Sequence, residues 1–194
     1  PLDGSFADWT DVGRLPALGG LDGQPEFADV WACWNETGIA VACRVSGKRQ
    51  PLQCDPRSYR TGDNLRICID TRDARDNKRA TRFCQQFYFL PTGGGPSGRD
   101  ACAGVGKFQR APGEAPPVDA DALRIAAKVT AAGYSMMGYI PAECMPGFDP
   151  AEHPRIGFYY IIEDADFGQQ YLTVGDDLLW HADPSTWAAA VLGR

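Results

Sequence analysis

The chain has 194 residues, 44% of them hydrophobic and 23% charged, with a formal net charge of −6. These proportions are typical of a globular protein, and the length is sufficient for one well-buried core, so we expect a single domain over residues 1–194. The basic residues are dispersed along an acidic chain, which argues against nucleic acid as a partner. No apolar run approaches the roughly 20 residues that cross a bilayer, so no membrane insertion is expected.

Short apolar segments follow one another along the chain and are separated by turns rich in glycine and proline, of which there are 22 and 15. The connections Asn35–Gly38 and Ala131–Gly133 have hairpin length. Strands are predicted at 30–34, 39–45, 65–70, 82–90, 123–130, 134–140 and 155–163. The residues of 187–192 are compatible with either a short helix or a strand. This succession predicts an all-β fold, an antiparallel β-sandwich of immunoglobulin-like or jelly-roll-like type.

The stretch at about 91–117 is predicted to be a flexible insertion at one rim of the sandwich. It contains Gly93-Gly94-Gly95-Pro96 and a second proline-rich turn further on. A run of this kind favours neither helix nor strand, because glycine loses more conformational entropy than other residues when it is fixed in either.

Two neighbouring segments, 65–70 and 82–90, are predicted to form an antiparallel hairpin. Apolar and polar residues alternate in each, as they do in a half-buried strand. The alternation assigns one face to the core, with Leu65, Ile67, Ile69, Phe83, Phe87 and Phe89. The other face carries the polar and thiol side chains Arg66, Cys68, Asp70, Arg82, Cys84, Gln86 and Tyr88.

The register of this hairpin follows if Asp70 stands opposite Arg82. Cys68 then lies opposite Cys84, with Cβ atoms roughly 4.5–5.5 Å apart. These two cysteines are therefore candidates for a disulfide or a thiol pair.

The polar face of the hairpin is the candidate ligand-binding surface. Arginine and glutamine offer the forked hydrogen bonds that vicinal hydroxyls accept, and tyrosine offers an apolar plane with a polar tip. In the preceding hairpin, Val30, Ala32 and Trp34 point to the opposite side from Trp31 and Cys33. We therefore expect Trp31 to extend this face, together with Cys33 and Arg44. A purely structural interpretation is also open, in which Arg66, Asp70 and Arg82 form an ion-pair network without a ligand.

Several motifs occur in a fixed order over nearly the whole chain: Asp3–Trp9, the hairpin 28–41, Gly62–Arg72, Gly133-Tyr134 to Ile140-Pro141, Ile156–Phe158 and Asp183–Trp187. The ordered series resembles the family-nine carbohydrate-binding modules and their DOMON-like relatives. The resemblance implies a sandwich of carbohydrate-binding-module type in which 187–192 is a closing strand. It also implies non-catalytic binding of a saccharide or polysaccharide, and a secreted or extracytoplasmic protein.

Modules of this family hold the end of a sugar chain between two tryptophans, and the corresponding positions here fall at about Arg60 and Leu172. The nearest aromatic residues are Tyr59 and Tyr171. The resemblance therefore implies a site that lacks the usual tryptophan clamp, with Tyr59, Tyr171 and Trp31 as the stacking candidates beside the polar face.

The resemblance also implies two further ligands. Family-nine modules often hold calcium near acidic loops, and Asp164 and Asp166 are the candidate ligands, although no run has EF-hand spacing. Some DOMON-like relatives bind haem between methionine and histidine and transfer electrons, which is an alternative function from a different class. The residues available for that role are Met136, Met137, Met145, His153 and His181.

The sequence carries no nucleophile elbow, zinc-protease, phosphate-loop or dinucleotide motif, so we predict a non-catalytic module. Its seven cysteines include no Cys-x-x-Cys pair, which argues against a structural zinc site. A further alternative is an interaction domain of a longer protein, whose polar face docks another domain. In that case the loop 91–106 should cover the face, whereas a binding face should be concave and open.

Overall fold

The computed structural model describes residues 6, 9, 13–23, 25–108 and 115–193. Of the Asp3–Trp9 motif, only Phe6 and Trp9 therefore lie within the described residues. The described residues form two antiparallel sheets and short 3₁₀ helices, and contain no α-helix. The predicted all-β antiparallel sandwich is confirmed.

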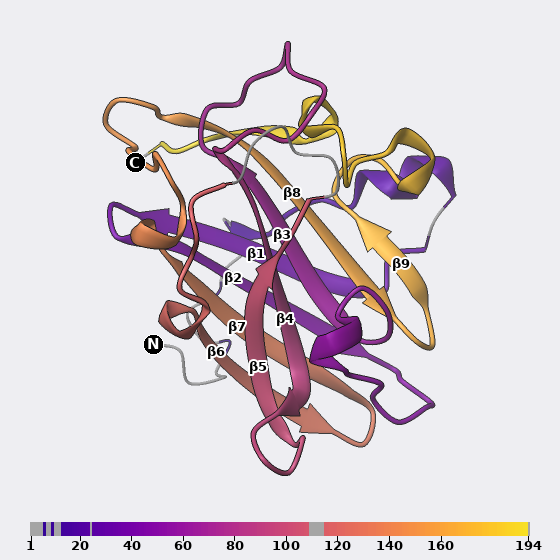
Figure 1. The fold of residues 1–194 in the computed structure, drawn as a ribbon. Helices are drawn as coiled ribbons and strands as arrows, with labels where there is room; N and C mark the ends of the chain where they lie inside the picture. Colours follow the sequence, from indigo (N-terminus) through magenta and orange to yellow (C-terminus); the bar gives the residue numbers. More distant parts are fainter. Residues whose placement is uncertain (1–5, 7–8, 10–12, 24, 109–114, 194) are drawn as a thin grey trace.

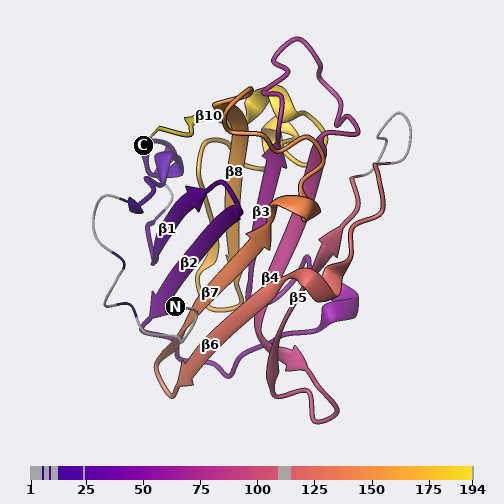
Figure 2. The ribbon, with the colours of Figure 1, turned by 90° about the vertical axis from the view of Figure 1, so that its left-hand side faces the viewer.

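The two sheets face each other (Figures 1 and 2). The four-stranded sheet has the order β1 (Ala28–Asn35), β2 (Gly38–Ser46), β7 (Gly133–Pro141) and β6 (Arg124–Thr130). The six-stranded sheet has the order β10 (Ala188–Val191), β8 (Arg155–Asp164), β3 (Asn64–Asp70), β4 (Cys84–Gly94) and β5 (Asp100–Gly106), with β9 (Gly168–Tyr171) paired to β8. The 3₁₀ helices are η2 (Leu18–Asp22), η3 (Pro56–Ser58), η4 (Ala120–Ala122), η5 (Ala142–Cys144), η6 (Asp176–Leu178) and η7 (Pro184–Thr186).

The core lies between the sheets and is built by the alternation that the sequence predicts. Leu65 and Ile67 of β3 and Phe87 and Phe89 of β4 are at most 1% exposed. Phe89 packs against β7 at Gly138, where an added Cβ would overlap its ring. The absence of a side chain at Gly138 thus lets the two sheets approach closely around Phe89.

Strands β5 and β9 and the hairpin β4–β5 were not predicted. Two parts of the expected flexible insertion are regular structure, because 91–94 complete β4 and 100–106 form β5. The glycines serve the turn and a bulge: Gly95 has φ 67°, and the register shifts between Leu90 and Gly94. The part of the insertion at 109–114 lies outside the described residues. The strand predicted at 187–192 is confirmed as β10.

The predicted register of the β3–β4 hairpin is wrong by two residues. Asp70 pairs with Cys84 rather than Arg82, so Cys68 stands opposite Gln86 and not opposite Cys84. Both cysteines are free thiols. A shift of two preserves which residues share a face, because side chains alternate with a period of two.

The shift arises because β4 begins later than predicted. Residues 81–84 form a turn in which the Cys84 N–H donates to the Thr81 carbonyl at 3.0 Å. Phe83 consequently leaves the core: it is half-buried, with the guanidinium groups of Arg72 and Arg82 at 4.5 and 4.8 Å from its ring centroid.

Candidate functional site

The outer face of the six-stranded sheet holds a cavity of about 360 Å³, here called the Arg66 pocket. Its floor comes from β3, β4, β8 and β9, and its walls come from the loops before β3, after β5 and around η6. The lining residues are Arg60, Arg66, Gln86, Lys107, Glu163, Gln169, Asp176, Trp180 and His181. None of them belongs to 91–106, so the loop that a docking face should carry does not line the described pocket.

Arg66 is the central group of the pocket and is only 5% exposed. Its Nη2 donates to Glu163 Oε2 at 2.6 Å, and its Nε donates to Asn64 Oδ1 at 3.1 Å. Burial lowers the pKa of Arg66 and raises the pKa of Glu163, and the attraction between the two groups opposes both shifts. The guanidinium is therefore a fixed, charged donor whose position is set before any ligand arrives.

Trp180 forms one wall of the pocket but is only 1% exposed. Its ring stacks on Tyr159 at 4.8 Å between centroids, and its Nε1–H donates to Asp176 Oδ1 at 2.7 Å. The Arg66 guanidinium lies 5.2 Å from its ring centroid. Trp180 thus holds the floor of the pocket in place and presents no free face for stacking.

Tyr59 stands at the rim, where it stacks on Tyr88 with centroids 4.2 Å apart and planes at 12°. Its hydroxyl donates to Gln86 Oε1 at 3.3 Å and accepts from Arg60 Nε at 3.3 Å. The half-buried Tyr59 ring is fixed at both its face and its hydroxyl, so little rotational freedom remains to be lost on binding.

Two outward-facing glycines of β5 make room for this arrangement. A Cβ at Gly104 would overlap the Tyr88 ring, and a Cβ at Gly106 would overlap the Gln86 amide and lie 2.7 Å from the Tyr59 hydroxyl. The aromatic pair can lie across the sheet edge only because β5 has no side chains there.

We therefore expect Gly104→Ala to lower the free energy of unfolding by about 1–3 kcal/mol, because the new methyl group forces Tyr88 out of its place. Urea denaturation measures the loss, and near-ultraviolet circular dichroism reports the Tyr59–Tyr88 stack. Gly193→Ala is the matched control, since nothing lies within 4 Å of a Cβ there. Equal stability of the two variants would contradict the prediction.

The remaining predicted site residues lie elsewhere. Asp70 is buried and caps a turn, accepting from the N–H groups of Arg72 at 3.0 Å and Ala74 at 2.9 Å. Arg82 is exposed in the turn before β4. An ion-pair network of Arg66, Asp70 and Arg82 is therefore not formed, because Arg66 pairs with Glu163 instead.

Neither Trp31 nor Tyr171 is an open stacking surface. Trp31 lies on the four-stranded sheet, packed with Ala42 and Met137, so the expectation that it extends the Arg66 face is wrong. Parity fixed which side of its strand it occupies, but not which sheet that strand joins. Tyr171 is 8% exposed, and its ring lies against Gly19 and Gly175.

Asp164 and Asp166 do not fit calcium, because a lysine ammonium already occupies the space between them. Lys48 Nζ lies 2.8 Å from Asp164 Oδ1, 3.7 Å from Asp166 Oδ2 and 2.5 Å from Asp63 Oδ1. Among the described residues, no group of three or more His, Cys, Asp or Glu side chains is placed to hold a metal ion. A calcium ion would have to displace a buried cation that these carboxylates already bind.

The methionines and histidines do not converge on a haem site. Met136 and Met145 are core residues, and Met137 packs on the outer face of the four-stranded sheet. His181 lines the Arg66 pocket on the other side of the sandwich, and His153 is exposed in a loop.

Four of the predicted site residues lie together at or beside the pocket: Arg66, Gln86, Tyr59 and Tyr88. Sequence reasoning missed the contribution of β8, β9 and the later loops: Lys107, Glu163, Gln169, Asp176, Trp180 and His181. Glu163 could have been predicted, because its position in the alternating pattern of β8 places it on the outer face. Lys107 and Trp180 come from irregular segments, which carry no periodic signal.

Two solved structures cover nearly all of this fold. A family-nine carbohydrate-binding module from Caldicellulosiruptor kristjanssonii in complex with cellotriose has a TM-score of 0.63 at 14% identity, over 98% of this chain and 88% of that chain. The same kind of module in complex with glucose has a TM-score of 0.65 at 12% identity, over 98% and 90%. No family model and no curated protein matches the sequence. The chain thus has the fold of the family-nine carbohydrate-binding modules.

Of the described residues, none forms a helix with the length and apolar character needed to cross a membrane.

Proposed function

We propose that this domain binds a saccharide without catalysis, at the Arg66 pocket. The observation that carries the proposal is the ion pair of the buried Arg66 with the half-buried Glu163 (2.6 Å), which faces a cavity lined mostly by amide and charged side chains. Such a set offers donors and acceptors in fixed directions, which is what recognition of a polyhydroxylated ligand requires.

The size and composition of the pocket support a short saccharide segment. A cavity of about 360 Å³ lies at the lower end of the range for small-molecule sites, roughly 300–1,000 Å³. The fold likeness to modules crystallised with cellotriose and glucose supports the same ligand class.

The two carboxylates in the pocket are already engaged, which supports binding without bond cleavage. Glu163 is paired with Arg66, and Asp176 accepts from the Trp180 indole N–H at 2.7 Å. A general acid must instead be free to give its proton to the leaving group.

Affinity should be modest, because no aromatic ring in the pocket is fully open. Trp180 is covered, and one face of Tyr59 is occupied by Tyr88. Binding then depends on hydrogen bonds, whose net contribution is about 0.5–1.5 kcal/mol each for neutral groups.

Arg60→Ala is the variant that tests the site with the least risk to the fold, since Arg60 is exposed and lines the pocket. We expect its affinity to fall about tenfold, which corresponds to the loss of roughly 1.4 kcal/mol from one charge-assisted hydrogen bond. A glycan array identifies the ligand, and isothermal titration calorimetry then measures the loss.

Arg57→Ala is the matched control, because Arg57 is an exposed arginine in the adjacent η3 that does not line the pocket. It should bind as the unmodified protein does. A protein that binds no glycan on the array, or an Arg57→Ala variant weakened as much as Arg60→Ala, would overturn the assignment.

A further inference from the structure

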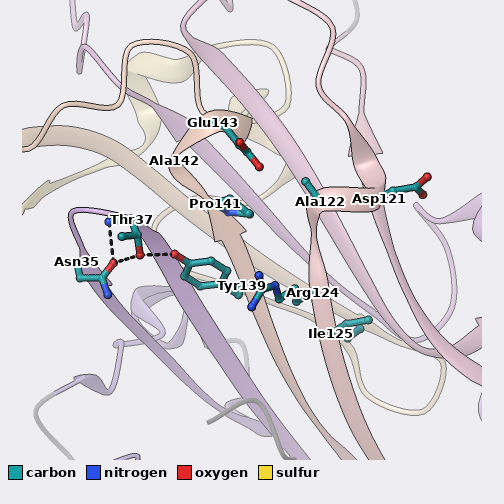
Figure 3. A pocket seen from close by; sticks show the side chains of 10 residues that line it. All are labelled: Asn35, Thr37, Asp121, Ala122, Arg124, Ile125, Tyr139, Pro141, Ala142 and Glu143. Carbon is teal, nitrogen blue, oxygen red and sulfur yellow. Dashed lines mark hydrogen bonds between the residues drawn. The ribbon is translucent and has the colours of Figure 1, made fainter.

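A second hollow, of about 1,180 Å³, lies beside the four-stranded sheet. Figure 3 shows the side chains that line it. It is formed by the β1–β2 turn, the end of β7, the start of β6 and the short helices η4 and η5. The residues that line it include Asn35, Thr37, Asp121, Arg124, Tyr139 and Glu143. We call it the Tyr139 groove. It shares no lining residue with the Arg66 pocket.

Tyr139 is the aromatic centre of the groove, and its hydroxyl is fixed. The Thr37 hydroxyl lies 2.6 Å from the Tyr139 hydroxyl and donates to Asn35 Oδ1 at 2.7 Å (Figure 3). The Thr37 backbone N–H donates to the same oxygen at 2.9 Å. The ring is thus held by the β1–β2 turn, whose own conformation is set by Asn35.

The ring of Tyr139 is half-buried rather than covered, and its cross-strand neighbour on β2 is small. Its partner on β2 is Ala40, which in turn faces Cys33 on β1. At Gly38 an added Cβ would lie 2.8 Å from the Tyr139 hydroxyl and overlap the Ile140 carbonyl. The close approach of ring and turn therefore requires glycine at this position.

One charged side chain lies near the ring, and two more line the groove. Arg124 pairs with Tyr139 across β6 and β7, and its guanidinium lies 6.0 Å from the ring centroid. Asp121 and Glu143 are exposed on η4 and η5 at the border of the groove. None of the ion pairs formed by the described residues involves these three charges.

We propose that the Tyr139 groove is a second saccharide-binding site, which takes an extended stretch of a polysaccharide. A fixed tyrosine ring beside a guanidinium, in a groove that two carboxylates also line, offers an apolar plane for a sugar face and charged partners for its hydroxyls. The mixture of both charge signs disfavours a strongly anionic or cationic ligand. The ligand class rests on the proposed function of the Arg66 pocket.

The two sites lie on opposite outer faces of the sandwich. One domain can then hold two saccharide chains at once, and its binding to an insoluble polysaccharide gains from both contacts.

The test is nitrogen-15 NMR of the full chain, titrated separately with cellohexaose, xylohexaose and mannohexaose. We expect one of these probes to shift two separate sets of amide signals, around Arg66 and around Tyr139. Tyr139→Ala should abolish the second set and keep the first, while Arg60→Ala should weaken the first and keep the second. Lys128→Ala, on the exposed part of β6 away from the groove, is the control.

The outcomes separate the two proposals. Shifts around Arg66 alone would overturn the second site and leave the proposed function standing. Shifts around Tyr139 alone would support the second site and overturn the assignment of the Arg66 pocket. Shifts at neither place with any probe would overturn both.

Discussion

Replacing Lys48 with methionine should lower the free energy of unfolding by about 3–5 kcal/mol, the cost of leaving buried charges without their partner. The Lys48 ammonium lies 2.5 Å from Asp63 and 2.8 Å from Asp164, and the side chains of all three residues are at most 2% exposed. Methionine fills a similar volume but carries no positive charge to pair with the two carboxylates. Urea denaturation of the variant measures the loss, with Lys128→Met on exposed β6 as a control expected within about 0.5 kcal/mol of the unmodified protein.

The pH dependence of this loss identifies its cause. Burial alone lowers the pKa of Lys48, but its hydrogen bonds to Asp164 and Asp63, together with the attraction of their charges, outweigh burial and the net shift is upward. The stabilisation by Lys48 is therefore fully present below the unfolded lysine pKa of about 10.4 and is lost as the pH rises through the folded value.

The protonation of the carboxylates affects stability at acidic pH rather than at alkaline pH. Burial raises the pKa of Asp63, Asp164 beside it adds to the rise, and Lys48 opposes it. Without the ammonium the pKa of Asp63 rises further, so Asp63 takes up a proton more readily and its buried charge disappears. The loss in free energy of unfolding caused by Lys48→Met should therefore shrink as the pH falls. A deficit that stays constant from neutral to acidic pH would mean that lost packing, rather than charge, causes it.

Replacing Trp180 with alanine should cost about 3–5 kcal/mol of stability, the usual range for removing a buried tryptophan. The change removes the ring that stacks on Tyr159, the N–H that binds Asp176 and the aromatic face beside the Arg66 guanidinium. We expect saccharide affinity to fall about tenfold or more in the same variant, because the floor of the pocket is no longer fixed.

Two further variants separate packing from polar contact. Trp180→Phe keeps an aromatic ring on Tyr159 but loses the bond to Asp176 and part of the buried ring volume, so it should cost about 1–2 kcal/mol, less than Trp180→Ala. Leu178→Ala, in the same segment and 55% exposed, should change stability by less than about 0.5 kcal/mol. If Trp180→Phe were as unstable as Trp180→Ala, the hydrogen bond and not the stacking would be the main contribution.

The sequence by itself determined the fold class and most of the strands. Alternation at Leu65, Ile67 and Ile69 is strictly local, because a strand with one buried face must repeat every two residues. For the same reason parity correctly placed Arg66, Gln86 and Tyr88 on one face, even though the register was wrong by two. The ordered motifs of the resemblance added the closing strand 187–192.

Only the tertiary structure decided which elements meet. Three features depend on contacts between residues far apart in sequence. They are the packing of Trp31 on the four-stranded sheet, the ion pairs of Lys48 with Asp63, Asp164 and Asp166, and the position of Trp180 in the wall of the pocket. Local patterns carry no record of such contacts, because a side chain's parity is set by its own strand. Its partners are set instead by how the sheets stack and where irregular loops cross them.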